Sequence, residues 1–308
     1  MEKISSAVVI GTGMMGPGIA AVIASAGIPV AIASRTVENA ATGVTKAKQC
    51  IDLLLQRGLA DADRVASISS SADLQPLIAS AALVVESGPE DMRLKQDLFV
   101  FLDRIAPASA ILASNTSGLR ITEIASRCRF PERVLTAHFW NPPHLMPLVE
   151  IVMGERTAPE FVSAMVELLR SCGKQPVVVH KDRPGQLGNR LQMALLREAC
   201  AIVEEGIASV EDVDLAAKTG FGLRLPVYGI FEHQDAVGLD MGLGILDYIA
   251  RDLYNEPRAP DFYRGKVAEG KLGAKTGEGF YDWNVRSIDD LKRKRDAFVL
   301  DVITRQRS

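Results

Sequence analysis

The sequence has no hydrophobic run long enough to cross a membrane and no marked excess of charge of either sign. None of its apolar stretches approaches the roughly 20 residues that a membrane span requires. Lys and Arg total 35 against 38 Asp and Glu, which excludes the strongly basic surface of a typical nucleic-acid-binding protein. The N-terminal residues lead directly into an apolar segment, without the layout of a signal peptide. We therefore expect a cytoplasmic protein with neither a membrane nor a nucleic acid as its partner.

Cysteine is scarce as well, with four residues in 308 and no CxxC pair. The four lie far apart in the sequence, whereas metal ligands come in closely spaced clusters, so we expect reduced thiols and no metal site. The sequence does contain 47% hydrophobic and 24% charged residues, a composition typical of packed globular proteins. A chain of this length can form two domains.

The first half of the chain alternates short apolar segments with amphipathic ones, which predicts an α/β fold. We expect a doubly wound, mostly parallel sheet with helices on both faces. The expected strands are 7–10, 30–33, 83–86, 110–113, 134–137, 148–152 and 176–179. Two segments between the second and third of these, 45–58 and 61–67, predict an inserted helical pair.

The pattern changes near Pro184, after which apolar residues recur at helical spacing. We expect an N-terminal domain over 1–183 and an all-helical C-terminal domain over 184–308. The main predicted helices of the second part are 187–205, 210–219 and 238–254. The last segment, 286–307, is highly charged and predicts an exposed terminal helix.

A GxGxxG motif lies between the first expected strand and the following helix, at Gly11, Gly13 and Gly16. The first glycine allows a tight turn, the second lets a pyrophosphate approach the backbone, and the third lets the helix pack on the strand. The helix N-terminus then offers free N–H groups to the phosphates. This context predicts a dinucleotide site, which Met14 and Met15 are expected to line.

The end of the second expected strand carries Ser34 and Arg35, where an NAD enzyme usually has an acidic residue that binds the ribose hydroxyls. A hydroxyl and a guanidinium suit the 2′-phosphate of NADP. Arg35 can equally stack on the adenine of NAD. We expect NAD as cofactor and leave NADP open.

His138 and Glu150 lie on neighbouring expected strands, across a proline-rich turn. Removing a hydride from an alcohol leaves a proton for a base, and histidine is suited to that role near neutral pH. A carboxylate on its other ring nitrogen fixes the tautomer, as in other His–carboxylate pairs. Ser117 follows another strand end, on the side where open α/β sheets bind ligands. These residues predict a dehydrogenase site.

The chain resembles the 3-hydroxyacyl-CoA dehydrogenase family, including the 3-hydroxybutyryl-CoA dehydrogenases, along nearly its whole length. The matching segments, in order, are the Gly11 turn, 114–117, 138–150, Pro184-Gly185 with 189–191, 237–240 and 271–281. The resemblance implies a Rossmann-type domain, a helical pair that helps to hold CoA, and a helical domain that forms a homodimer. It also implies a role in fatty acid metabolism.

The same resemblance implies roles for individual residues. His138 is then the general base, Glu150 its orienting carboxylate, and Ser117 and Asn189 hydrogen-bond the reacting oxygen. Further expected cofactor-binding residues are Glu86, Lys95 and Asn115, and Asn141 is expected to bind substrate. The reaction implied is NAD(P)-dependent hydride transfer at the C3 hydroxyl of a 3-hydroxyacyl-CoA.

Pro147 departs from this pattern, because acyl-CoA members usually carry a lysine three residues before the glutamate. The surrounding segment is closer to relatives that act on free hydroxy acids, such as gulonate and carnitine dehydrogenases and a dehydrogenase of pyridine-carboxylate breakdown. A free hydroxy acid or a hydroxymethyl-aromatic acid is therefore the alternative substrate. The alternative from another class is a non-catalytic dinucleotide-binding or structural protein, like the lens lambda-crystallin.

Overall fold

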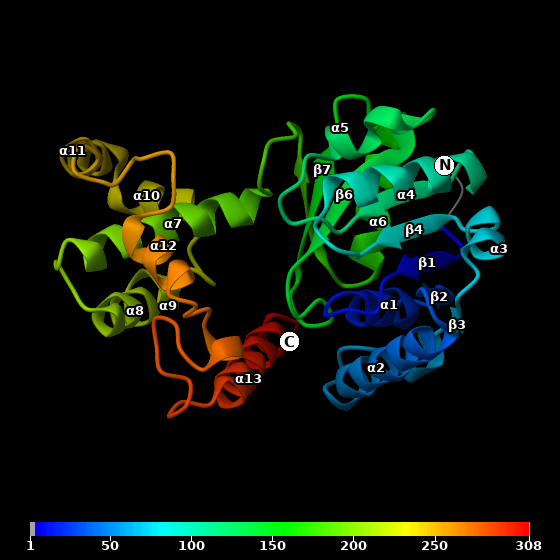
Figure 1. Cartoon of the computed structure of the whole chain (residues 1–308), viewed down its shortest axis with the longest axis horizontal. Helices are drawn as coiled ribbons and strands as arrows, with labels where there is room; N and C mark the ends of the chain where they lie inside the picture. The colour runs from blue at the N-terminus through cyan, green and yellow to red at the C-terminus, as the bar shows by residue number, and fades with distance from the viewer. Residues whose placement is uncertain (1–3, 308) are drawn as a thin grey trace. The chain divides into compact units, whose positions relative to one another are not determined.

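The computed structural model describes residues 4–307 and contains one eight-stranded sheet (Figure 1). The strand order is β3-β2-β1-β4-β5-β6-β7-β8. The strands are β1 (Ala7–Ile10), β2 (Val30–Ala33), β3 (Ile68–Ser71), β4 (Leu83–Glu86), β5 (Ile111–Ser114), β6 (Val134–Phe139), β7 (Leu148–Met153) and β8 (Gln175–Val179). Neighbouring strands are parallel except at β6–β7, so the predicted doubly wound, mostly parallel fold is confirmed. Residues 1–3, part of the N-terminus in which we expect no signal peptide, lie outside the described residues.

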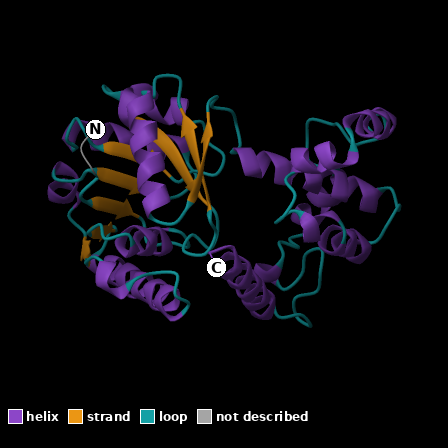
Figure 2. Ribbon diagram, turned by 180° about the vertical axis from the view of Figure 1, so that it is seen from behind, coloured by secondary structure: helices purple, strands orange, loops and turns teal. Residues whose placement is uncertain are grey.

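Helices cover both faces of the sheet (Figure 2). Val9 and Val85 point to one face and Val8 and Val84 to the other, because successive side chains of a strand alternate. A strand buried on both faces is apolar at nearly every position, which makes these short strands visible in the sequence. The first face packs against α1 (Gly16–Ser25), α2 (Val37–Gln56) and α6 (Pro159–Ser171). The second packs against α3 (Leu74–Ala79), α4 (Met92–Ile105) and α5 (Ile121–Ile124).

The expected helical pair between β2 and the next expected strand is only half present. Its first member is longer than expected, because Thr36 caps α2 by accepting a hydrogen bond from the Asn39 N–H. The prediction of a second helix over 61–67 is wrong. This segment contains a single 3-10 turn, η1 (Ala62–Arg64), and is followed by the edge strand β3, which the sequence analysis missed. A three-residue turn offers far less surface than a helix for holding a large substrate.

The remaining helical elements are η2 (Ala125–Arg127), η3 (Pro131–Arg133), α7 (Leu187–Glu204), α8 (Val210–Thr219), α9 (Phe221–Arg224), α10 (Ile230–Val237), α11 (Leu239–Ile249), α12 (Asp261–Ala268), η4 (Ala274–Thr276) and α13 (Ile288–Arg307). The predicted helical C-terminal domain is thus confirmed. No helix within residues 4–307 is both long and apolar enough to span a membrane.

The chain divides into two compact units. One unit holds the sheet and extends to Asn189, and it also includes the residues from Lys294 onwards; the other is 190–293. The end of α13 therefore packs on the sheet-containing unit, where Leu300 is buried with Leu54 and Leu145. Most residues of α13 are exposed, as expected of the terminal helix, and Leu300 is the buried exception among its described side chains.

Candidate active site

The turn between β1 and α1 needs glycine at two positions for steric reasons. Gly11 has a φ of 115°, and a Cβ atom there would lie 2.5 Å from the Ser87 carbonyl oxygen. A Cβ atom on Gly16 would lie 2.0 Å from the Gly11 carbonyl oxygen. Position 13 differs, because a Cβ atom there meets nothing within 4 Å. The turn is therefore closed on the protein side and open at the residue expected to face a pyrophosphate.

The open side of this turn lines a cavity of about 530 Å³. Gly13 and Met14 form one wall, Lys46 of α2 lies on another, and His144 lies on the loop after β6. Met15 packs on the core under the turn. The glycine backbone, the helix N-terminus and the adjoining cavity fit a dinucleotide phosphate.

Ser34 and Arg35 follow β2 at the same edge of the sheet. The Ser34 N–H donates to the Ser71 carbonyl of β3, and the Arg35 side chain is exposed. No acidic residue occurs at the end of β2; the first one along the chain is Glu38, in the first turn of α2.

Glu86, at the end of β4, forms a buried ion pair with Lys95 of α4. The Lys95 ammonium lies 2.7 Å from both carboxylate oxygens, and the Ser114 hydroxyl donates to Glu86 Oε2 at 2.7 Å. The Gly88 N–H donates to the other oxygen at 2.6 Å. Glu86 and Lys95 are 1% and 2% exposed, so they join β4, α4 and β5 beneath the site.

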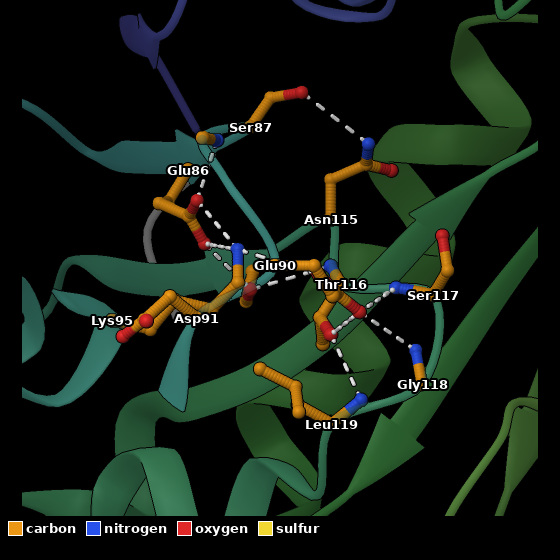
Figure 3. Close-up of polar contacts among 12 residues, drawn as sticks. Glu86, Ser87, Glu90, Asp91, Lys95, Asn115, Thr116, Ser117, Gly118 and Leu119 are labelled. Carbon is orange, nitrogen blue, oxygen red and sulfur yellow. Dashed lines mark hydrogen bonds and ion pairs between the residues drawn. The ribbon is translucent and has the colours of Figure 1, made fainter. Parts of the chain in front are cut away.

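Glu90 organises the loop that follows β5, and the sequence analysis missed it (Figure 3). Its Oε1 accepts hydrogen bonds from the Thr116 hydroxyl at 2.6 Å and from the Ser117 and Gly118 N–H groups at 2.9 Å each. Lys95 lies 3.8 Å from its other oxygen. An acidic residue so close to the end of β4 was a signal from which the sequence analysis could have predicted a residue of the site. Glu90 leaves the exposed Ser117 side chain facing outward from a fixed backbone.

Asn115 joins the ends of three neighbouring strands. Its Oδ1 accepts a hydrogen bond from the Phe139 N–H at 2.8 Å, and its Nδ2 donates to Ser87 Oγ at 3.4 Å. Its own N–H donates to the Glu86 carbonyl at 2.7 Å. The expected cofactor-binding residues on β4 and β5 thus share one hydrogen-bonded edge with the strand that carries His138.

His138 and Glu150 are directly opposite one another in the antiparallel β6–β7 pair. Their side chains therefore share a face, and His138 Nδ1 lies 2.6 Å from Glu150 Oε2. A carboxylate only accepts, so the ring proton is on Nδ1 and Nε2 is left to accept a proton. Both residues are buried, at 5% and 0% exposure.

Two further donors hold the Glu150 carboxylate, and neither came from the sequence analysis. Trp140 Nε1 donates to Oε2 at 3.0 Å, and the Gly188 N–H donates to Oε1 at 2.7 Å. Burial by itself raises the pKa of the Glu150 carboxyl. The hydrogen bonds from His138, the Gly188 N–H and Trp140 outweigh burial and hold this pKa below its ordinary value.

The segment that leads into α7 returns to the Ser117 loop. Asn189 Nδ2 donates to the Ser117 carbonyl at 3.0 Å, and the Gln186 side chain donates to the Thr116 carbonyl at 3.3 Å. The structure thus brings Asn189 to the Ser117 backbone. Asn141 lies two residues after β6 and is exposed.

The cysteine thiols are protonated and form no disulfide bond among the described residues. Burial raises the pKa of the Cys50, Cys128 and Cys172 thiols to about 11, and all four cysteines are free. Within residues 4–307 no group of three or more His, Cys, Asp or Glu side chains is arranged to hold a metal ion.

The sequence matches two family models that together cover most of the chain. Residues 6–183 match the 3-hydroxyacyl-CoA dehydrogenase NAD binding domain, and residues 185–283 match the 3-hydroxyacyl-CoA dehydrogenase C-terminal domain. This chain belongs to the 3-hydroxyacyl-CoA dehydrogenase family. The predicted family is therefore confirmed, and the protein is an oxidoreductase with an NAD-binding domain.

Relatives of this dehydrogenase act on two kinds of substrate, according to their names. It is 35% identical to a 5-formyl-3-hydroxy-2-methylpyridine 4-carboxylate 5-dehydrogenase of Mesorhizobium japonicum, over 93% of each chain. It is 37% identical to the mitochondrial hydroxyacyl-coenzyme A dehydrogenase of Sus scrofa, over 89% of this chain and 90% of the relative.

Solved structures separate these two groups more clearly. A 5-formyl-3-hydroxy-2-methylpyridine 4-carboxylic acid 5-dehydrogenase, described as an NAD+-dependent dismutase, has a TM-score of 0.92, 33% identity and 97% coverage of both chains. The (S)-3-hydroxybutyryl-CoA dehydrogenase of Ralstonia eutropha has a TM-score of 0.74 and 30% identity, over 91% of this chain and 99% of that chain. The family is common to both, but the similarity in structure is greater to the enzyme with a pyridine-carboxylate name.

Proposed function

We propose that this dehydrogenase oxidises a free hydroxy acid, with hydroxymethyl-aromatic acids as the first class to test, rather than a 3-hydroxyacyl-CoA. The observation that carries the proposal is the TM-score of 0.92 to a pyridine-carboxylate dehydrogenase over 97% of both chains. The reduced insertion supports it, because the family resemblance implies that a helical pair helps to hold CoA, and here only α2 and a three-residue turn are present. Pro147, where acyl-CoA members usually carry lysine, points in the same direction.

His138 acts as the general base in this reaction. A bound NAD would supply the hydride acceptor. His138 takes the hydroxyl proton on Nε2, because Nδ1 is held by Glu150 at 2.6 Å. Ser117 and Asn189, joined through the Ser117 carbonyl, hold the reacting oxygen, and Asn141 lies on the substrate side. A positioned base of this kind contributes roughly 10²–10⁴-fold to the rate.

The cofactor of the proposed reaction is NAD, bound at Gly11, Gly13 and Gly16 with Met14 and Met15 beside them. Glu86, Lys95 and Asn115 support the nicotinamide end, and Ser34 and Arg35 contact the adenosine end. NADP is the second candidate, because the exposed Arg35 guanidinium suits a 2′-phosphate. If Arg35→Ala weakens NADPH binding no more than NADH binding, the 2′-phosphate assignment is contradicted.

The active protein in this proposal is a cytoplasmic homodimer formed through residues 190–293. Helices α8, α10, α11 and α12 contain no buried residue, and the unit exposes many large apolar side chains. Apolar surface of this extent on a soluble protein is typical of an interface.

The first experiment compares initial rates on the purified protein. Hydroxymethyl- and formyl-aromatic carboxylates and short free hydroxy and keto acids are tested against acetoacetyl-CoA, each with NAD(H) and NADP(H). We expect kcat/KM for a free acid to exceed that for the thioester at least about 100-fold, since a site that hydrogen-bonds one substrate rejects another that leaves its polar groups unpaired. Turnover confined to the thioester would establish the acyl-CoA reaction instead. NADH binding without turnover of either class would favour the non-catalytic alternative.

Two histidine variants complete this experiment. His138→Gln is expected to lower kcat about 100-fold or more while NADH binding is unchanged. His180→Gln changes an exposed histidine and is the matched control. Full turnover by His138→Gln would rule out the general-base assignment.

A further inference from the structure

The Glu150 carboxylate is shared between two ring N–H groups on a single oxygen. His138 Nδ1 lies 2.6 Å and Trp140 Nε1 lies 3.0 Å from Oε2, while the Gly188 N–H donates to Oε1 at 2.7 Å. The centroids of the His138 and Trp140 rings are 5.9 Å apart. Glu150 is fully buried, so these donors stand in for the water that an exposed carboxylate would bind.

We propose that Trp140 is a positioning residue that competes with His138 for Glu150 Oε2 and so limits how basic the His138 ring becomes. The inference rests on the proposed role of His138 as the base. Each hydrogen bond that a carboxylate accepts withdraws charge from its oxygens, and a weaker acceptor stabilises the charged imidazolium less. A base that has to release its proton for the reverse reaction benefits from such a limit.

Gly188 makes room for this arrangement. A Cβ atom at position 188 would lie 2.5 Å from Trp140 Cζ2 and 3.3 and 3.4 Å from Cη2 and Cε2. Cζ2 and Cη2 are outer atoms of the indole that have no counterpart in a phenylalanine ring. A glycine at this position therefore allows the indole to lie against the start of α7, while its own N–H holds the second oxygen of Glu150.

The groups that contact Glu150 give the expected direction. His138, from β6, is the titratable group that acts on Glu150. Trp140 and the Gly188 backbone are neutral donors, and Val177, opposite Glu150 on β8, is apolar. Removing the indole N–H leaves Oε2 to His138 alone and strengthens that hydrogen bond. The His138 ring then takes up a proton at a higher pH.

The test is a pH titration of the histidine rings by NMR on the cofactor-free protein. The chain has only four histidines and two tryptophans, and His138→Gln assigns the His138 signal. We expect Trp140→Phe to raise the midpoint of the His138 titration by about 0.5–1 pH unit. Trp283→Phe, the other tryptophan, is the matched control and leaves it unchanged. A Trp140→Phe protein that titrates like the wild type but melts earlier would overturn the proposal and leave Trp140 a packing residue.

The NMR titration needs no substrate. An unchanged midpoint in Trp140→Phe would therefore contradict the role of Trp140 without bearing on the proposed reaction. Once a substrate is found, the acid limb of kcat/KM should move upward with the NMR midpoint in Trp140→Phe, with little change in KM for NAD. A change in KM for NAD without movement of the acid limb would contradict the proposal.

A double-mutant cycle tests the coupling between Trp140 and Gly188. Gly188→Ala should lower the melting temperature by at least about 4 °C in the wild type, because its methyl group displaces the indole. In Trp140→Phe the same change should cost much less, since phenylalanine lacks the outer indole atom Cζ2 that makes the short contact. Equal losses in the two backgrounds would contradict the coupling.

Discussion

A buried carboxylate is stable in a protein only when donors replace the water it has lost, and Glu150 meets this condition. Its three donors come from β6, from the loop after β6 and from the N-terminus of α7. Glu86 follows the same rule, with Lys95, Ser114 and a backbone N–H around it. The polar groups under the site are therefore rigid, which keeps the His138 ring in one tautomer and one orientation.

Replacing Glu150 by glutamine tests whether the buried carboxylate is stabilised by its donors. The pKa of Glu150 is held below its ordinary value, so its ionised form stabilises the fold above about pH 4.5, and this contribution is lost as the pH falls through the lowered pKa. We expect Glu150→Gln to cost about 1–3 kcal/mol of unfolding free energy at pH 7, because an amide cannot accept all the donors. The difference from the wild type should shrink below about pH 4.

Urea unfolding between pH 3 and pH 7 measures the loss of unfolding free energy in Glu150→Gln and its dependence on pH. Glu155→Gln is the control, because the Glu155 side chain is 71% exposed. A difference for Glu150→Gln that stays constant down to pH 3 would show that the carboxylate is not held in its charged form.

At the scale of single elements, the β1–α1 turn separates two roles of glycine. Gly16 is required for the fold, because its Cβ would overlap the Gly11 carbonyl. Gly13 has open space around it, so its lack of a side chain serves what binds there. Strand β3 was missed because its sequence, Ile-Ser-Ser-Ser, is mostly polar. It lies at the edge of the sheet, where a strand needs few apolar residues.

Alanine at these two positions should have different effects. Gly16→Ala is expected to destabilise the protein by about 1–3 kcal/mol or more, because backbone atoms have to move. Gly13→Ala should change stability by less than about 1 kcal/mol and weaken NADH binding at least about 10-fold. Thermal melting measures the change in stability, and titration of NADH fluorescence measures the change in NADH affinity. If Gly13→Ala binds NADH like the wild type, the pyrophosphate does not approach the backbone at this residue.

At the scale of the whole molecule, the helical unit 190–293 buries little apolar surface of its own. Leu243, Leu246 and Tyr248 of α11 are 60%, 61% and 83% exposed. A stable homodimer interface is usually apolar at its centre and buries well over 1,000 Å². The exposed apolar side chains of this unit are of the kind that such an interface buries. The end of α13, by contrast, returns to the sheet-containing unit through Leu300.

Light scattering after size-exclusion chromatography should give about twice the chain mass of 33.3 kDa. Leu246→Glu is expected to produce monomers at micromolar concentration, because a charge buried at an apolar interface is costly. Leu94→Glu changes a leucine of α4 that is 58% exposed and is the control. A wild-type monomer at 50 µM, roughly a thousand times a tight dimer's Kd, would contradict the homodimer.

The sequence by itself determined seven of the eight strands, the dinucleotide turn and the His138–Glu150 pair, because these depend on local patterns: apolar runs, glycines in a turn, and side chains on adjacent strands. The tertiary structure alone decided that Glu90 holds the Ser117 loop and that Trp140 and Gly188 share Glu150. Gly188 lies 38 residues from Glu150 in the chain, and no local pattern encodes a contact made by a backbone N–H across that separation. The tertiary structure also decided that the insertion holds one long helix, a 3-10 turn and an edge strand, since the turn and the polar strand carry no strong periodic signal.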